Sequence, residues 1–227
     1  MTSVLRRPRV DVLRDVESSG VVAVVRLADA AAVRDVARAL LSGGVRAIEI
    51  TMTVPRAVEV IAELATSVPS DVLIGAGTVL DPATAMAVID AGASFVVSPV
   101  LRLDVIEACR QRDVAVMPGC FTPSEIFTAW QAGADVVKVF PATALGPGFF
   151  KDVRGPLPQV RLMPTGGVTR DNAGEWIRAG AVAIGVGTAL VDPRAVAAGR
   201  FDAISESAAH FVGAVRAARD AALAGAS

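Results

Sequence analysis

The chain predicts an α/β fold, a (β/α)8 (TIM) barrel with an extra N-terminal helix, on three observations. Short β-branched runs alternate with alanine-rich segments whose apolar residues recur at helical spacing. Eight such units follow one another in about 200 residues, which is the size of a small barrel. Glycine flanked by alanine closes several of the helical segments, where it tolerates a left-handed conformation. A doubly wound open sheet is the competing architecture.

The expected strands are apolar, largely β-branched runs bounded by turn residues. In chain order they span residues 21–26, 47–51, 73–78, 95–99, 115–120, 136–141, 161–167 and 183–188. Strands of this kind are nearly all apolar, because helices cover one face and the barrel interior the other. Polar residues inside them therefore need an explanation of their own.

The expected helices begin where a side-chain oxygen can accept backbone N–H groups. Asp81 and Thr122 stand directly before a proline, which suits the first turn, and Thr169 precedes a further candidate. The candidates span residues 11–18 (the extra N-terminal helix), 29–41, 55–66, 82–91, 103–112, 123–132, 170–179 and 201–224. No change of composition marks a linker, so we expect a single domain over residues 1–227.

Composition and charge exclude several classes of function. Apolar residues make up 53% of the chain, charged residues 20%, and the net charge is −1. A chain with this balance has no electrostatic reason to bind nucleic acid or an anionic membrane. No apolar stretch approaches the roughly 20 residues of a membrane span, and the N-terminal segment lacks the apolar block of a signal peptide. We therefore expect a cytoplasmic protein.

Cysteine and histidine are too few for a metal centre. Cys109 and Cys120 have neither metal-ligand spacing nor a secreted context, so we expect free thiols. The single histidine, His210, lies in an alanine-rich amphipathic stretch and is expected on a helix surface. One histidine cannot assemble a histidine-rich zinc site, and we expect no bound metal.

Lys138 is the residue that points most directly to chemistry. It stands within the apolar run VVKVFP (136–141), and the chain has only two lysines, since 20 of its 22 basic residues are arginine. Burial disfavours a charged ammonium, and the neutral amine is the form that attacks a carbonyl carbon. The position therefore suggests a Schiff-base lysine. The alternative is that its stem packs on apolar neighbours while its head group reaches water.

Polar residues also mark the ends of the other strands, which build the active site of a barrel. The residues at these ends are Arg26, Glu49, Thr51, Thr78, Ser98, Pro99, Cys120, Lys138, Thr165, Gly166, Gly167, Gly187 and Thr188. Within AIEIT (47–51), two-residue periodicity places Glu49 and Thr51 on one face and the isoleucines on the other. Glu49 is then expected inside the barrel. The alternative is a structural ion pair with Arg26 or Lys138.

A candidate phosphate site follows the seventh strand. The segment PTGGVT (164–169) leads from a strand through two glycines to a helix start, which exposes backbone N–H groups to an anion. Thr188, at the end of the eighth strand, would add a hydroxyl. Phosphate sites lie after the last two strands of such barrels, although glycine pairs also form ordinary turns.

Six motifs together resemble those of one family. They are AIEIT (47–51), GAGTVL (75–80), VSP (97–99), MPG (117–119), VKVFP (137–141) and PTGGV (164–168). In this order they are similar to the 2-keto-3-deoxy-6-phosphogluconate (KDPG) and 4-hydroxy-2-oxoglutarate (KHG) aldolase family. The resemblance implies a class I aldolase on a trimeric barrel, free of metal and cofactor. Such an enzyme cleaves KDPG to pyruvate and glyceraldehyde 3-phosphate, and KHG to pyruvate and glyoxylate.

The resemblance also implies roles for individual residues. Lys138 matches the lysine that forms the Schiff base, and Glu49 matches the glutamate that shuttles protons. The residues that match the pyruvyl pocket are Thr78, Pro99, Phe140 and Thr165, with Thr51 beside Glu49. Arg26 resembles an arginine that faces the substrate carboxylate, and the phosphate site corresponds to Gly166, Gly167 and Thr188.

One position departs from the KDPG-specific pattern. Relatives of that type have an arginine two residues after the threonine of the second strand, where this chain has Thr53. Arg26 would then hold the substrate carboxylate, with help from Thr78. Aldolases of the 2-dehydro-3-deoxy-6-phosphogalactonate type also lack that arginine, and the segment ALGP (144–147) is similar to theirs. The substrate stereochemistry is therefore open.

Two other classes of function remain as alternatives. An epimerase or isomerase with a phosphate-binding barrel would share the double glycine and need no imine-forming lysine. A non-catalytic sugar-phosphate-binding barrel would be expected to have lost Lys138 or Glu49, and both are present.

Overall fold

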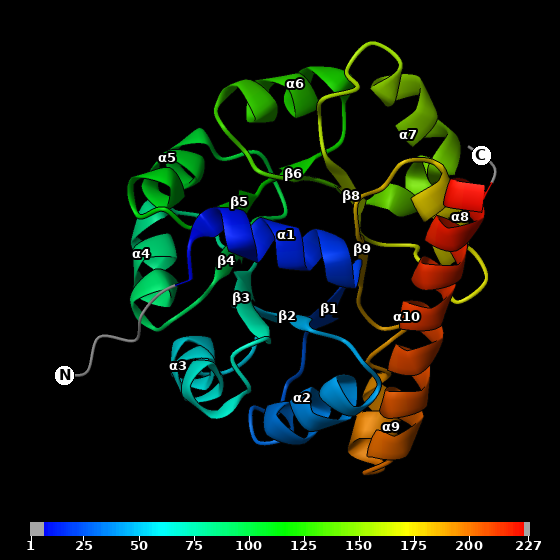
Figure 1. Ribbon diagram of the computed structural model, residues 1–227. Coiled ribbons are helices and arrows are strands. Elements are labelled where there is room, and N and C mark those ends of the chain that lie inside the picture. Colours follow the sequence, from blue (N-terminus) through cyan, green and yellow to red (C-terminus); the bar gives the residue numbers. More distant parts are fainter. Residues whose placement is uncertain (1–6, 225–227) are drawn as a thin grey trace.

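The computed structural model describes residues 7–224, and it confirms an α/β fold with parallel strands in a curled sheet and helices around it (Figure 1). The two ends of the predicted domain, residues 1–6 and 225–227, lie outside the described residues. The strands are β1 (Val21–Val25), β2 (Ala47–Thr51), β3 (Leu73–Gly77), β4 (Phe95–Val97), β5 (Ala115–Met117), β6 (Gly119–Cys120), β7 (Val137–Val139), β8 (Leu162–Pro164) and β9 (Ile184–Val186). Each expected strand contains at least one of them.

The strands form two sheets. One has the order β5-β4-β3-β2-β1-β9 and the other the order β6-β7-β8, and all the pairings are parallel. The strand expected over residues 115–120 is interrupted at Pro118, because proline has no N–H group to donate to a ladder. As a result β5 pairs with β4 on one side, while β6 pairs with β7 on the other.

Backbone contacts join the two sheets at both edges. The N–H of Lys138 donates to the carbonyl of Pro118 at 3.0 Å, and the N–H of Asp135 donates to that of Val116 at 3.1 Å. At the other edge, a parallel bridge between Thr165 and Gly185 connects the end of β8 to β9. The sheets therefore curl toward each other around a common interior.

A helix comes after most of the strands along the chain. They are α1 (Arg9–Ser19), α2 (Val33–Ser42), α3 (Ala57–Ser67), α4 (Pro82–Asp90), α5 (Leu103–Gln111), α6 (Pro123–Gln131), η1 (Ala142–Ala144), α7 (Gly146–Arg154), α8 (Ala173–Arg178), α9 (Pro193–Ala197) and α10 (Phe201–Ala224). The extra N-terminal helix is confirmed as α1. Two of the three predicted caps are confirmed, since Asp81 caps α4 and Thr122 forms a capping box with Glu125 on α6. The third is wrong, because α8 has its N-cap at Asn172 and not at Thr169.

Three helical segments were not predicted from the sequence, namely η1, α7 and α9. In α7 a proline stands in the first turn, and Phe150 and Val153 are buried three residues apart. In α9 the carboxylate of Asp192 accepts the N–H of Arg194 at 2.9 Å, an Asp-Pro start like that of α4. Helix α8 begins three residues later than expected.

The core consists of two layers on opposite faces of the strands. The outer layer lies between strands and helices and includes Ile48 and Ile50. The inner layer is smaller and comprises Val12, Val16, Val22, Ala47, Leu73, Phe95, Val97, Ala115, Met117, Val136, Met163 and Ala183. Many of these stand at the first residues of their strands, and Val12 and Val16 come from α1. Helix α1 therefore closes the amino ends of the strands, and the carboxyl ends are left for a site.

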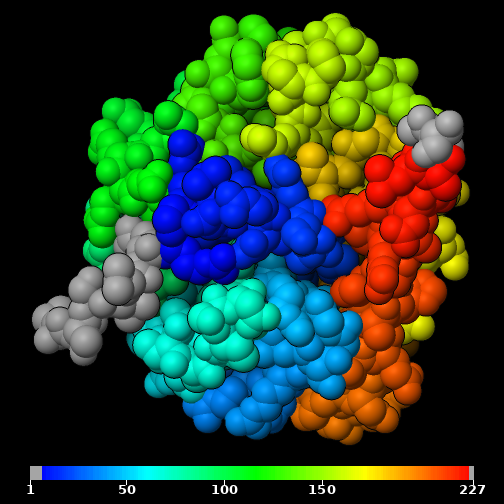
Figure 2. Space-filling view, in the orientation of Figure 1, coloured from blue at the N-terminus to red at the C-terminus, as the bar shows by residue number. Residues whose placement is uncertain are grey.

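Helix α1 lies across the centre of the face shown in Figure 2. The guanidinium of Arg219 on α10 donates to the carbonyl of Ser18 at 2.8 Å, which ties the two helices together. The N-terminal helix is thus held by both the apolar interior and the last helix of the chain.

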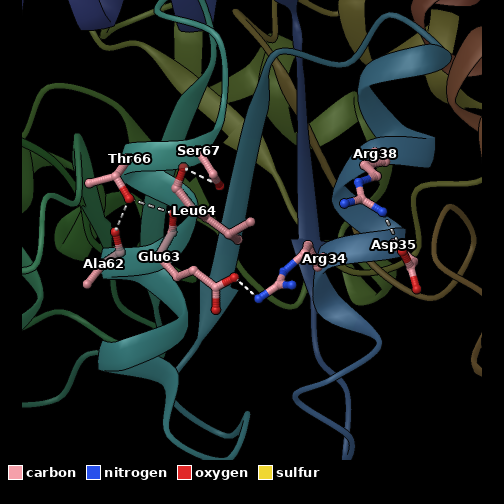
Figure 3. A network of polar contacts seen from close by, with 8 residues as sticks. All are labelled: Arg34, Asp35, Arg38, Ala62, Glu63, Leu64, Thr66 and Ser67. Atoms are coloured by element: carbon pink, nitrogen blue, oxygen red, sulfur yellow. Dashed lines mark hydrogen bonds and ion pairs between the residues drawn. The ribbon is translucent and has the colours of Figure 1, made fainter.

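Polar contacts on the outer helices are remote from the interior. Figure 3 shows Arg34 of α2 paired with Glu63 of α3, and Arg38 bonded to Asp35 within α2 at 3.1 Å. The hydroxyl of Thr66 donates to the carbonyl of Glu63 at 2.9 Å. Exposed ion pairs of this kind contribute at most about 1 kcal/mol each. They orient α2 and α3 and take no part in the chemistry argued below.

The predictions for cysteine and histidine are confirmed. Cys109 and Cys120 are free and buried, and burial raises the pKa of each thiol to about 12, so both stay protonated. His210 is exposed on α10. Between residues 7 and 224, no helix combines the length and the apolar character that a membrane crossing requires.

Candidate active site

Lys138 and Glu49 meet inside the curled sheet. Their side chains are only 6% and 1% exposed, and the Lys138 Nζ lies 4.0 Å from the Glu49 Oε1. Lys138 comes from β7 and Glu49 from β2, strands that belong to different sheets. Almost the whole lysine side chain is buried beside a carboxylate, which argues against the alternative that the stem covers apolar surface while the head group extends into water.

Strand periodicity explains why both side chains point inward. Ile48 and Ile50 pack in the outer layer, so Glu49 between them faces the interior, as predicted. Val137 and Val139 likewise pack in the outer layer on either side of Lys138. Lys138 pairs in register with Gly119 on one side and Met163 on the other.

The Glu49 carboxylate is buried without a hydrogen-bond partner. Neither of its oxygens accepts a hydrogen bond from any group in residues 7–224. The 4.0 Å separation from the Lys138 Nζ exceeds hydrogen-bond length. Lys138 and Glu49 do form an ion pair, the alternative expected from the sequence, but buried polar groups are nearly always hydrogen-bonded as well, so the two unbonded oxygens need a further explanation. A group that engages a bound molecule is such an explanation.

Thr165 stands at the end of β8, and Phe140 lies next to the lysine. The Thr165 Oγ1 is a second buried polar atom that has no hydrogen-bond partner within the described chain. Its backbone is held on both sides, since its N–H donates to Val139 and its carbonyl accepts the N–H of Ala142. The half-buried ring of Phe140 lies beneath the ammonium, 5.2 Å from the Lys138 Nζ to the ring centroid.

Three other predicted residues stand where strands end. Thr78 follows β3 and is half-buried, with a φ of 61°, a left-handed conformation that is rare for a β-branched residue. Pro99 lies two residues beyond β4 and is also half-buried. Arg26 directly follows β1 and is exposed. Backbone strain of this kind concentrates at functional sites, which supports Thr78 as a site residue.

Thr51 lies on the same face as Glu49, but its hydroxyl is already engaged. It donates to the carbonyl of Val25 at 3.2 Å and lies 2.7 Å from the hydroxyl of Thr53. Thr51 is fully buried, and it fastens β2 to β1. Thr53 is exposed in the loop that follows β2.

The double glycine after β8 has the geometry of an anion site. Gly166 and Gly167 both have positive φ, at 83° and 76°. Their N–H groups donate to no acceptor within residues 7–224. Thr188 is exposed beyond β9 and lines a hollow with Arg170 and Arg200. Free N–H groups of consecutive residues in a turn are available to bind an anion.

Two residues near the site were missed from the sequence. Thr143 of η1 packs against Gly167, so that a β-carbon on this glycine would lie 2.7 Å from the Thr143 Oγ1. Gly77 of β3 lies against the Glu49 carboxylate. The only available signal was the glycine content of GAGT (75–78), which does not specify a neighbour on another strand.

Known proteins match this chain over most of its length. The family model described as KDPG and KHG aldolase matches residues 12–207. The chain belongs to this family. A 2-dehydro-3-deoxy-phosphogluconate aldolase of Pseudoalteromonas atlantica is 36% identical over 201 residues, which cover 88% of this chain and 93% of that relative.

The relatives are aldolases named for more than one substrate. A 2-dehydro-3-deoxy-6-phosphogalactonate aldolase of Escherichia coli is 36% identical over 153 residues, 67% of this chain and 75% of its own. A KDPG aldolase of Legionella pneumophila was solved with pyruvate as a covalent carbinolamine intermediate, and it aligns with a TM-score of 0.82 and 29% identity over 88% of this chain and 97% of that one. Membership of the family makes the chain a lyase of the aldolase type, as the motifs predicted.

Proposed function

We propose that this chain is a class I aldolase that cleaves a phosphorylated 2-keto-3-deoxy sugar acid to pyruvate and glyceraldehyde 3-phosphate, with Lys138 as nucleophile and Glu49 as acid and base. One observation carries the proposal: a buried lysine lies 4.0 Å from a buried carboxylate whose two oxygens have no hydrogen-bond partner in the described chain. At this separation both groups can contact the same carbonyl group, the amine at its carbon and the carboxyl at its oxygen.

The first stage forms the imine. The neutral amine of Lys138 adds to the C2 ketone, which gives a carbinolamine. Glu49 donates a proton to its hydroxyl, water leaves, and a protonated imine forms between C2 and Nζ. Low exposure of both side chains favours this step, because little bulk water competes with the carbonyl group for the amine and the carboxyl group.

The second stage breaks the C3–C4 bond. Glu49, now a carboxylate, takes the proton of the C4 hydroxyl, and the electrons of the C3–C4 bond move into a C2–C3 double bond. The iminium nitrogen is neutralised, and C4 leaves as the aldehyde of glyceraldehyde 3-phosphate. Glu49 then returns the proton to C3, and hydrolysis of the protonated imine releases pyruvate, restores the amine and gives the remaining proton back to Glu49.

The ends of the substrate extend to the strand termini. The free N–H groups of Gly166 and Gly167, with the hydroxyl of Thr188, are proposed to hold the phosphate. Arg26 and Thr78 are proposed to hold the carboxylate. Thr165, Phe140 and Pro99 would then line the pyruvyl group, since Phe140 lies against the lysine and Thr165 presents a buried hydroxyl with no hydrogen-bond partner in the described chain.

Trapping with borohydride tests the nucleophile. Incubation with pyruvate and sodium borohydride, followed by peptide mass spectrometry, should show a reduced pyruvyl adduct on Lys138. The other lysine, Lys151, is exposed on α7 and serves as an internal control for nonspecific reductive alkylation. An adduct on Lys151 alone, or none at all, would contradict the proposal and favour an isomerase or a binding protein.

A second candidate differs in the stereochemistry of the substrate. Thr53 stands where KDPG-type relatives have an arginine, and a 2-dehydro-3-deoxy-6-phosphogalactonate aldolase is among the relatives. Comparing kcat/KM for the gluconate, the galactonate and KHG decides among them. Thr53→Arg is expected to favour KDPG by about tenfold, since one charged hydrogen bond contributes about 1.5–3 kcal/mol. An unchanged ratio of kcat/KM values would mean that position 53 does not contact the substrate carboxylate and that Arg26 binds it instead.

We further propose that the two sheets form one closed (β/α)8 barrel, with β5 and β6 as one strand bent at Pro118. The hydrogen bonds from Lys138 and Asp135 at one edge and the bridge from Thr165 to Gly185 at the other support closure. Amide protons at both edges should then exchange as slowly as those of β2 and β3. Fast exchange confined to the edge from Thr165 to Gly185 would contradict it.

A homotrimer is proposed as the assembled form. Large apolar side chains between 38% and 50% exposed come from neighbouring βα units, namely Val100, Leu103, Phe121, Phe127 and Trp130. The rings of Phe127 and Trp130 stack with centroids 5.8 Å apart. Exposed apolar groups of this size mark contact surfaces. Light scattering should give a mass three times the chain mass of 23.2 kDa. The Phe127→Glu variant should have a lower mass in solution, because a charge on this surface weakens the contact between subunits.

A further inference from the structure

Gly77 lies directly against the Glu49 carboxylate. An ideal β-carbon on Gly77 would stand 1.9 Å from the Glu49 Oε1, 2.5 Å from Cδ and 2.7 Å from Cγ. Each of these distances is shorter than a real contact allows, and they include the reactive end of the side chain. The carboxylate therefore occupies the volume that any other residue at position 77 would fill.

The backbone of Gly77 does not require a glycine. Gly77 is the last residue of β3, and it is not among the residues with positive φ. Its carbonyl accepts the N–H of Met52 at 2.8 Å, as an ordinary strand residue would. A glycine within a strand weakens it, since it adds conformational entropy to the unfolded chain. Space for a neighbour is the remaining reason for its presence.

Strand register explains why Glu49 reaches this position. Glu49 pairs with Gly75 and Thr51 pairs with Gly77, so Gly77 is the diagonal neighbour of Glu49 on the next strand. Side chains on strands lean along the strand, which brings the carboxylate over residue 77. Strand β3 thus presents no side chain at either position beside Glu49.

Other strand glycines make room for different groups. A β-carbon on Gly75 would meet the ring of Phe95 at 2.3 Å, and one on Gly119 would meet the backbone of Pro99 at 2.3 Å. A side chain at Gly75 would therefore displace a core ring, and one at Gly119 would displace the main chain. At Gly77 the atoms in the way belong to the flexible side chain of Glu49, so that side chain is what gives way.

We propose that Gly77 is a positioning residue that sets the distance between the Glu49 carboxylate and Lys138. This inference rests on the proposed role of Glu49 as acid and base. A methyl group at position 77 forces Oε1 to retreat by about 1.5 Å before ordinary contact is restored. Misplacement of a catalytic group by about 1 Å can cost up to 100-fold in rate.

The test is a double-mutant cycle of Gly77→Ala and Glu49→Asp. Gly77→Ala should lower kcat by about 10- to 100-fold with KM near that of the wild type. Aspartate is one methylene shorter, which withdraws the carboxylate from the added methyl. The double variant should therefore have a kcat above the product of the two single effects, by about tenfold.

Two other glycines provide matched controls. Gly213→Ala on α10, where a β-carbon meets nothing within 4 Å, should leave kcat unchanged. Gly75→Ala should lower the melting temperature through Phe95, and Glu49→Asp should not rescue it. Wild-type kcat in Gly77→Ala would overturn the inference. Additive losses, or a loss of melting temperature that accounts for the loss of activity, would overturn it as well.

The proposed function and this inference can fail separately. A wild-type protein that releases no pyruvate from any of the three keto acids removes the proposed function. In that case, crystal structures of the wild type and of Gly77→Ala test the position of the Glu49 carboxylate independently of any activity. A carboxylate displaced by about 1 Å or more in the variant upholds the positioning role. An unmoved carboxylate overturns it.

Discussion

The Nζ atom of Lys138 and the Oε1 atom of Glu49 lie 4.0 Å apart in an interior that water barely reaches. The two residues come from strands in different sheets, with 88 residues of chain between them, and both carboxylate oxygens lack a hydrogen-bond partner within residues 7–224. A pair selected for stability would be closer and would have its remaining oxygen bonded. The separation instead lets the amine and the carboxyl group act on neighbouring atoms of one bound molecule.

Replacing the lysine should remove activity without unfolding the protein. In Lys138→Ala we expect pyruvate release from KDPG to fall to background, because no other group forms the imine. Lys151→Ala, on the surface of α7, should retain wild-type rates. Coupled pyruvate assays measure the loss, and circular dichroism with cooperative melting checks the fold. Turnover by folded Lys138→Ala would eliminate the Schiff-base mechanism.

Replacing the carboxylate should separate imine formation from proton transfer. Glu49→Gln keeps the shape of the side chain but cannot exchange a proton, so kcat should fall by about 10²- to 10⁴-fold. Slow trapping of pyruvate on Lys138 by borohydride should persist, since the amine remains. Glu59→Gln on the exposed face of α3 is the matched control. Equal turnover in Glu49→Gln and Glu59→Gln would exclude the acid and base role.

Sequence periodicity predicted the inward direction of the site residues well. The expected strand over residues 47–51 agrees residue for residue with β2, and Glu49 faces inward between two outward isoleucines. A single charged residue in an apolar strand is expected to face the interior, because on the outer face it would be buried against the apolar sides of the helices. The meeting of Glu49 and Lys138 follows from that constraint.

Features that depend on a neighbouring strand could not be predicted. The hydroxyl of Thr51 bonds to the carbonyl of Val25, and the choice of acceptor depends on the register between β1 and β2. The space that Gly77 leaves for Glu49 depends in the same way on the register of β3. Helix α7 was missed because its first residues, GPG (146–148), are typical of a turn.

Acid should weaken the start of α6. The backbone N–H groups of Phe121 and Thr122 donate to the Glu125 carboxylate and hold its pKa below the ordinary value of 4.5. A depressed folded-state pKa contributes stability above the ordinary value, and that stability is lost as the pH falls through the folded value. Because Glu125 is only half-buried and its partners Phe121 and Thr122 are exposed, we expect an effect below about 1 kcal/mol.

Urea unfolding of the wild type and Glu125→Gln measures this effect. The difference in unfolding free energy between them should be largest at neutral pH and should shrink as the pH falls below 4.5. Taking the difference removes the contributions of other carboxylates. A difference that stays constant down to pH values where the protein unfolds would contradict the role of Glu125 in the cap.

The left-handed backbone of Thr78 should oppose stability. Its φ of 61° costs an L-residue roughly 1–2 kcal/mol, a strain that glycine does not have. Thr78→Ala and Thr78→Gly both remove the hydroxyl and differ mainly in that strain, so the glycine variant should unfold at the higher urea concentration, by about 1 kcal/mol. At Ala76, an ordinary strand position, Ala76→Gly should instead lower stability. Both Thr78 variants should lose activity toward KDPG. If Thr78→Gly is less stable than Thr78→Ala, the strain is absent, and the positive φ no longer supports a functional role for this residue.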